Sequence, residues 1–119
     1  MRILVVDDNR DSADALAWLL QSIGHEARTA YDGSSALRAV ERHSPDVVIQ
    51  DLGMPDRSGY EIARRMRKLS AARHALLVAM TGRRRTDAWR TAREAGFDRL
   101  LLKPVGLDAL EEALVLCGT

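Results

Sequence analysis

The stretch PDVVIQDLGMPDRSG, residues 45–59, contains a strand signal, a turn and a helix start in direct succession. Its apolar run at residues 47–49 predicts a buried strand with Asp51 at the tip. Asp is poor in strands, and a buried charge is costly unless it is paired. Taken alone, Asp51 is most simply a turn residue or a helix cap. Ser58, followed three residues later by Glu61, forms a capping box and predicts that a helix begins there.

Strand and helix signals alternate along the rest of the chain in the same way. Apolar runs lie at residues 3–6, 26–30, 47–49, 75–80 and 100–102, and the gaps between them show helical spacing. Gly24 and Gly96 are suited to end two of these helices, and Asp32-Gly33 predicts a turn. Continuous apolar strands indicate a parallel sheet that is covered on both faces. The pattern therefore predicts a doubly wound, three-layer α/β sandwich of five βα units.

Composition favours a single soluble domain spanning residues 1–119, with 46% apolar and 29% charged residues. A net charge of +1 gives no overall bias towards nucleic acid or an acidic membrane. No apolar run reaches the length of a signal-peptide core or a membrane span. Cys117 is the only cysteine, so an internal disulfide is excluded and a reducing compartment fits. We expect a cytoplasmic location.

Polar residues follow four of the five apolar runs. They are Asp7, Asp8 and Asn9, then Asp51, then Thr81 with Gly82, and finally Lys103 with Pro104. Ligands of open parallel sheets bind outside the carboxyl ends of the strands, so we expect these groups to converge. Singly, each group has a plainer interpretation as a loop start, a turn or a surface lysine. Jointly, their position at one sheet edge favours a site.

The expected site combines three carboxylates with one ammonium. Two carboxylates about 4 Å apart repel by roughly 4 kcal/mol at an effective dielectric near 20, so the cluster needs a counter-charge. A hard divalent cation such as Mg²⁺ suits an all-oxygen site and also holds phosphate oxygens. Lys103 adds a compact charge in a chain whose 18 Lys and Arg residues include only one other lysine, Lys68. Such a set is typical of phosphoryl transfer to an aspartate nucleophile.

The motifs ILVVDDN, DVVIQDLGMPDRSGYE, the Thr-Gly pair at residues 81–82 and AGFDRLLLKP resemble the receiver domain of two-component response regulators. The resemblance covers essentially the whole chain, and the order and spacing of the motifs make it specific. It implies a flavodoxin-like (βα)₅ fold with the strand order 2-1-3-4-5.

The resemblance also implies a role for each residue of the expected site. Asp51 is the phosphoacceptor in this comparison. The ligands of Mg²⁺ or Mn²⁺ are Asp7, Asp8, Asp51 and the carbonyl of Gly53. The groups that contact the phosphoryl group are Thr81, Lys103 and the Gly82 amide. The Lys103–Pro104 peptide is expected to be cis. Leu100 departs from the family pattern, because a Tyr or Phe that reports on the Thr is usual at this position.

The implied function is a phosphoacceptor in a two-component phosphorelay. A histidine kinase or histidine phosphotransfer protein would donate the group, and the face formed by the fourth helix, fifth strand and fifth helix would bind a protein target. The chain would be a monomer or weak dimer without direct nucleic-acid or membrane binding. It would perform only self-catalysed phosphotransfer and autodephosphorylation. A stand-alone regulator and the receiver of a hybrid kinase both fit.

Two other functions remain open from the residues. A phosphatase of the haloacid dehalogenase type would share the Asp, Thr, Lys and metal, but it carries a second Asp where this chain has Gly53. The run at residues 83–85, with Arg90 and Arg93, makes the fourth helix basic and raises nucleic-acid binding as an alternative. A solvated face explains that run more simply.

Overall fold

Strands and helices alternate strictly in the computed structural model of the chain, which describes residues 1–53, 59–82 and 85–115. In chain order the elements are β1 (Arg2–Val6), α1 (Arg10–Ser22), β2 (Glu26–Ala30), α2 (Gly33–His43), β3 (Val47–Asp51), α3 (Gly59–Arg67), the 3₁₀ turn η1 (Ser70–Ala72), β4 (Leu76–Thr81), α4 (Arg85–Ala95), β5 (Arg99–Leu102) and α5 (Leu107–Val115). The strands form one parallel sheet in the order β2-β1-β3-β4-β5. The predicted fold class and strand order are thereby confirmed.

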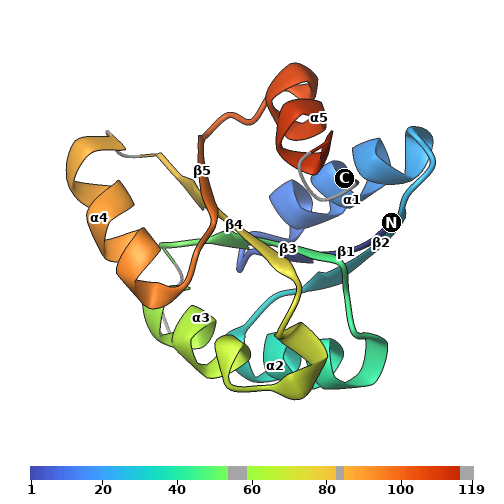
Figure 1. Cartoon of the computed structure of the whole chain (residues 1–119). Helices are drawn as coiled ribbons and strands as arrows, with labels where there is room; N and C mark the ends of the chain where they lie inside the picture. Colours follow the sequence, from blue (N-terminus) through green and yellow to red (C-terminus); the bar gives the residue numbers. More distant parts are fainter. Residues whose placement is uncertain (54–58, 83–84, 116–119) are drawn as a thin grey trace.

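The helices cover the two faces of the sheet unequally (Figure 1). Helices α1 and α5 pack on one face, and α2, α3 and α4 pack on the other. Successive strand residues alternate between these two cores, so Val47 and Ile49 face α1 and α5 while Val48 faces the opposite layer. Both faces of a central strand are therefore buried, which explains the continuous apolar runs in the sequence.

Two strands extend further than their apolar runs predict. Asp51 is the last residue of β3, at the predicted tip of the strand, and Thr81 is the last residue of β4, one position beyond the apolar run at residues 75–80. Sheet pairing continues to these positions, because Asp51 lies opposite Met80 and Thr81 opposite Leu102. Neighbouring strands therefore fix the backbone of both polar residues.

Several local predictions are corrected by the structure. Asp32-Gly33 is not a free turn, because Asp32 caps α2 and Gly33 is its first residue. The helical spacing between the apolar runs also predicts that Ile23 and Leu107 lie on buried stripes, whereas each is 36% exposed in the structure. Gly24 and Gly96 do follow helices and adopt positive φ angles of 97° and 111°, in the region that glycine tolerates best. The capping box at Ser58 lies outside the described residues.

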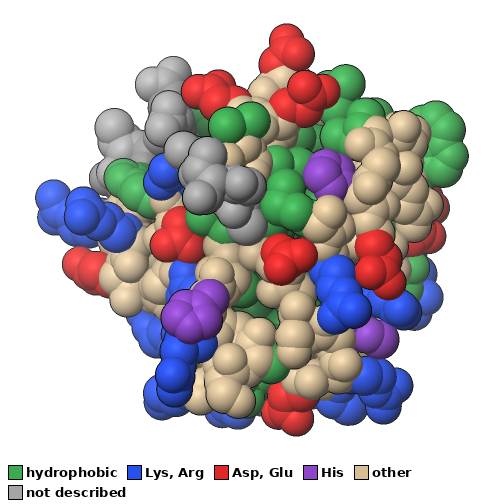
Figure 2. Space-filling model, turned by 45° about the vertical axis from the view of Figure 1, so that its right-hand side comes forward, with side chains coloured by type: hydrophobic (Ala, Val, Ile, Leu, Met, Phe, Trp, Pro, Cys, Tyr) green, Lys and Arg blue, Asp and Glu red, His purple; other side chains and the backbone are tan. Residues whose placement is uncertain are grey.

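The surface that carries the N-terminus is rich in cations (Figure 2). Lys and Arg side chains lie mainly in the lower half of this face, and apolar side chains lie beside a histidine in its upper middle. Within the described ranges, every helix is too short or too polar to cross a membrane.

Replacing Asp32 by Ala tests the cap of α2. The Asp32 carboxylate accepts a hydrogen bond from the Ser35 N–H at 2.7 Å, and this bond lowers the pKa of Asp32 below its usual value. We expect the variant to lose about 1 kcal/mol of unfolding free energy at neutral pH. Because the pKa is lowered on folding, this contribution exists above the unfolded pKa and vanishes as the pH falls through the folded pKa. Urea denaturation at neutral pH and near pH 3 should therefore show the difference shrinking in acid, and a constant difference would contradict the carboxylate cap.

Candidate functional site

The carboxyl end of β3 places Asp51 at the centre of the candidate site. Its side chain is largely buried, with 8% of the residue exposed. The next residue, Leu52, still donates its N–H to the Met80 carbonyl at 3.0 Å, so the sheet holds the backbone on both sides of Asp51. The backbone of Asp51 is therefore fixed, and its carboxylate lies at the carboxyl-terminal edge of the sheet.

Strand β1 brings two further carboxylates to Asp51. The N–H of Asp7 donates to the Ala30 carbonyl at 3.1 Å, which extends the pairing of β1 with β2 by one residue. Carboxylate oxygens of Asp7, Asp8 and Asp51 lie within 4.8 Å of one another. Asp7 and Asp51 are buried and Asp8 is exposed. The predicted convergence of the three carboxylates is thus present in the fold.

Lys103 lies between the two buried carboxylates. Its Nζ is 3.2 Å from Asp7 Oδ2 and 3.2 Å from Asp51 Oδ1. Partial burial disfavours the charged ammonium and so lowers the pKa of Lys103, but the Asp51 and Asp7 carboxylates raise it more, and the net pKa lies above the usual lysine value. The side chain is therefore a permanent cation at neutral pH.

Backbone N–H groups fix the orientation of the two buried carboxylates. Asn9 donates to Asp7 Oδ1 at 3.0 Å, and Gly53 donates to Asp51 Oδ1 at 3.3 Å. The Asn9 side chain in turn accepts the Ser12 N–H and caps α1. One loop therefore begins α1 and orients Asp7. Each of the two carboxylates keeps oxygen lone pairs that a cation can use.

The remaining predicted residues lie around this cluster. Thr81 ends β4 next to β3 and is buried, and Gly82 follows it at the surface. The Lys103 N–H donates to the Thr81 carbonyl at 2.9 Å, which ties the lysine to β4. Leu100 is buried on the α4 side of the sheet, and the Lys103–Pro104 peptide bond is cis.

Gln50 and Gly59 pack at the end of β3 beside Asp51, and the sequence did not predict either of them as part of the site. Gln50 is fully buried, and its Nε2 donates to the Gly59 carbonyl at 2.9 Å. Gly59 packs directly on the strand end, where an added Cβ would lie 2.8 Å from the Asp51 carbonyl oxygen. The sequence feature that could have indicated this contact is a polar residue, Gln50, at the end of an apolar run, followed nine positions later by Gly59.

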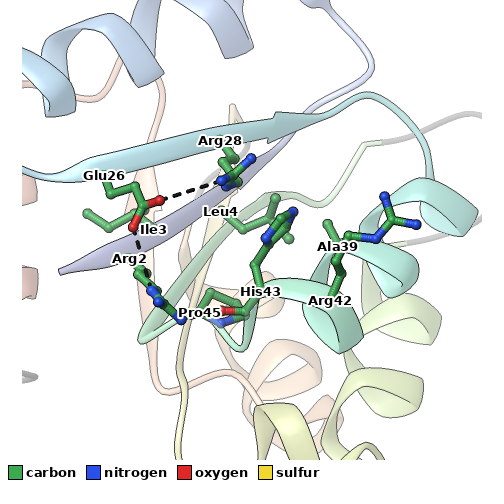
Figure 3. Close-up of a pocket in the computed structure, with 9 residues that line it drawn as sticks. All are labelled: Arg2, Ile3, Leu4, Glu26, Arg28, Ala39, Arg42, His43 and Pro45. Carbon is green, nitrogen blue, oxygen red and sulfur yellow. Dashed lines mark hydrogen bonds and ion pairs between the residues drawn. The ribbon is translucent and has the colours of Figure 1, made fainter.

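One pocket of the described surface lies away from these carboxylates. It has a volume of about 140 Å³ and lies beneath β2, at the amino ends of β1 and β2 (Figure 3). Glu26 there pairs with Arg2 and Arg28 at 3.5 Å each. The candidate site lies at the opposite edge of the sheet, where a second pocket of about 500 Å³ borders Asp7 and Lys103.

The donor set fits a hard divalent cation. Three carboxylates with unused oxygen lone pairs converge at an edge where only one ammonium, that of Lys103, is paired with them in the described residues. An oxygen-only set of this kind matches the preference of Mg²⁺. His and Cys, which softer transition metals favour, do not enter the described cluster.

The comparisons with known proteins agree with this geometry. The chain matches the response regulator receiver domain family across residues 3–115. It is 39% identical to the virulence sensor protein BvgS of Bordetella pertussis over 119 residues, which cover 96% of this chain and 10% of BvgS. The chain thus spans about a tenth of the length of that relative.

Solved structures of similar proteins share the fold. The chemotaxis protein CheY4 of Vibrio cholerae superposes with a TM-score of 0.91 at 27% identity, covering 98% of this chain and 97% of CheY4. The receiver domain of sensor histidine kinase PA1611 from Pseudomonas aeruginosa superposes with a TM-score of 0.88 at 26% identity, covering 99% and 98%, and that structure has a magnesium ion coordinated in its active site cleft. This chain belongs to the response regulator receiver domain family of two-component systems.

Replacing Gly59 by Ala tests the close packing on the Asp51 strand end. The added methyl group would meet the backbone of Asp51 and Leu52 at 2.8 Å, and backbone atoms cannot swing aside. We expect a loss of about 1–3 kcal/mol of unfolding free energy. Gly106→Ala is the matched control, because nothing lies within 4 Å of its added Cβ. Equal stability losses in the two variants would show that this packing is unimportant.

Replacing Asp8 by Asn tests the repulsion among the three carboxylates. In metal-free buffer we expect the variant to gain roughly 1 kcal/mol of unfolding free energy, because one of three neighbouring charges is removed. Asp11→Asn, in the first turn of α1, should instead lose stability through the helix dipole. Saturating Mg²⁺ should reverse the order of wild type and Asp8→Asn, because at about 100 times its Kd a ligand adds about 2.7 kcal/mol to the protein that binds it. Thermal unfolding with and without Mg²⁺ measures both effects, and an unchanged order would argue against a cation site.

Proposed function

We propose that Asp51 accepts a phosphoryl group from a phosphohistidine. The observation that carries this proposal is the pairing of Asp51 with Lys103 at 3.2 Å, inside a cluster that also holds Asp7 and Asp8. A carboxylate oxygen of Asp51 attacks phosphorus, the P–N bond to the donor imidazole breaks, and the imidazole leaves with its electron pair and takes up a proton. The product is an acyl phosphate on Asp51.

The same residues would hold Mg²⁺. Asp7, Asp8 and Asp51 supply carboxylate oxygens, and Gly53 contributes its carbonyl. When bound, this cation neutralises charge on the phosphoryl oxygens. Lys103 offers an ammonium to the transferred group, and Thr81 with the Gly82 amide supplies hydrogen-bond donors for it. The fixed backbone of β3 and β4 keeps the acceptor and these donors in place while the group moves.

The phosphodonor is a histidine kinase or a histidine phosphotransfer protein. The chain is similar to BvgS, whose name describes a sensor protein, and receiver domains act between such sensors and their outputs. We propose that residues 1–119 form one such domain in the cytoplasm, either alone or within a hybrid kinase. It performs phosphotransfer onto itself and its own dephosphorylation, without turnover of a separate substrate.

The phosphorylated state is signalled through the α4-β5-α5 face. New charge on Asp51 draws Lys103 and Thr81 towards it, and both residues border β5. Leu100, buried in β5, has neither a ring to rotate nor a hydroxyl to present. The change is therefore carried by the backbone of β5, through the 2.9 Å bond from the Lys103 N–H to the Thr81 carbonyl.

Labelling of Asp51 tests this function. With Mg²⁺ present, we expect a radiolabelled phosphohistidine donor to transfer one phosphoryl group per chain, and we expect Asp51→Asn to lose all labelling because it lacks the nucleophile. Phosphotransfer is followed by gel autoradiography, and beryllofluoride binding by NMR gives a second measurement.

Asp108→Asn is the matched control, because this exposed carboxylate in the first turn of α5 is not part of the carboxylate cluster. It should be labelled like wild type. Labelling that survives in Asp51→Asn would refute the acceptor assignment. Repeated turnover of a small phosphate ester by wild type would favour the phosphatase alternative.

A further inference from the structure

We propose that a basic groove between α3 and α4 docks an acidic segment of a partner protein. The groove has a volume of about 820 Å³ and lies where β4 and β5 begin, at the sheet edge opposite Asp51. Its lining residues come from α3, the segment after η1, the start of β4, α4 and the start of β5. The residues on which the docking depends are Arg67, Arg73, Trp89, Arg93, Asp98 and Arg99.

The charge of this basic groove is strongly one-sided. Four arginines and His74 line it, against one carboxylate, Asp98. Asp98 is already paired with Arg67 at 2.6 Å. Arg73, Arg93 and Arg99 are exposed, and none of them forms an ion pair with a carboxylate in the part of the chain that the structure describes. The groove therefore presents three uncompensated cations to solvent.

The floor of the basic groove is preformed. Arg67 donates to the Gly96 carbonyl through Nε at 3.0 Å and Nη2 at 2.8 Å, and to the Ala75 carbonyl through Nη1 at 2.8 Å. Asp98 Oδ2, which holds Arg67, also accepts the Leu77 N–H at 2.9 Å. One side chain thus ties α3 to the segments that begin β4 and β5. Because these backbone segments are already fixed, a ligand does not have to order the floor of the groove.

An acidic peptide segment matches the surface better than an apolar one. Half-buried Trp89 and buried Phe97 line the same groove as the arginines, so an apolar side chain of the ligand has apolar contacts there. Trp and Arg are among the residues most enriched at the few interface positions that contribute most of the binding energy. The guanidinium group of an arginine can bind a carboxylate through two parallel hydrogen bonds. The geometry therefore favours carboxylates flanking an apolar residue.

The pocket of Figure 3 shows why cations alone do not make such a site. It is also lined by arginines, but Arg2 and Arg28 share Glu26, so their charges are partly compensated. Arg42 is exposed and carries the same charge as Arg93, which lies in the last turn of α4. The two residues therefore form a matched pair for substitution.

The test uses a peptide of about ten residues in which about four Glu flank one Leu, compared with the same peptide carrying Gln. Trp18 is exposed on α1 and is the only other tryptophan, so in the Trp18→Phe background the fluorescence reports on Trp89 alone. We expect the Glu peptide to change this fluorescence and to bind at least about tenfold more tightly than the Gln peptide. Added salt should weaken the binding.

Charge reversals locate the binding. Arg93→Glu and, separately, Arg73→Glu should each raise the Kd of the Glu peptide by about tenfold or more. Arg42→Glu should leave this Kd within about twofold of the wild-type value. All three variants change the net charge equally, and circular dichroism checks that each is folded. Asp51→Asn should bind the peptide like wild type, which keeps this test separate from phosphotransfer.

Three results would overturn the proposal. The first is equal affinity for the Glu and Gln peptides. The second is an equal loss of affinity in Arg42→Glu and Arg93→Glu, which would indicate diffuse attraction to the whole surface. The third is tighter, Arg93-dependent binding of a single-stranded oligonucleotide with the same charge as the Glu peptide, which would assign the groove to nucleic acid.

Discussion

The ammonium of Lys103 between Asp7 and Asp51 is the interaction on which the site depends. Two buried carboxylates side by side would destabilise the sheet edge, and this single cation, 3.2 Å from each, compensates them. The compensation is incomplete, because one positive charge faces two buried negative charges and Asp8 adds a third. The native state therefore keeps an excess of negative charge at one point of its surface. An excess of carboxylate oxygens of this kind suits a hard divalent cation.

Much of the architecture could be predicted because βα units leave a simple pattern in the sequence. Parallel strands must leave their polar ends at one edge, so Asp7, Asp51 and Lys103 could be brought together without any coordinates. The ends of elements were less accessible. Asp51 and Thr81 belong to their strands because neighbouring strands supply partners for them, and this pairing is a tertiary effect that local propensity does not register.

The supporting contacts could not be predicted for a different reason. Arg67 binds the carbonyls of Ala75 and Gly96, and every residue has a carbonyl, so no side-chain pattern marks these partners. Gln50 and Gly59 are in contact although they are nine positions apart, and no local sequence pattern links them. The run at residues 83–85 drew attention to α4, but Arg83 and Arg84 lie outside the described residues. The cations of the basic groove instead come from separate segments, including Arg73 and Arg99, which are 26 positions apart in the numbering.

The charged pairs on β2 have a consequence for solubility. Strand β2 is an edge of the sheet, and its outer backbone groups could template the strand of another molecule. Glu26 and Arg28 are exposed on this strand and joined by an ion pair, with Arg2 on the neighbouring strand also bound to Glu26. A second sheet approaching this edge would have to strip water from three charges before any backbone bond could form. The pairs seen in Figure 3 thus protect the edge against aggregation.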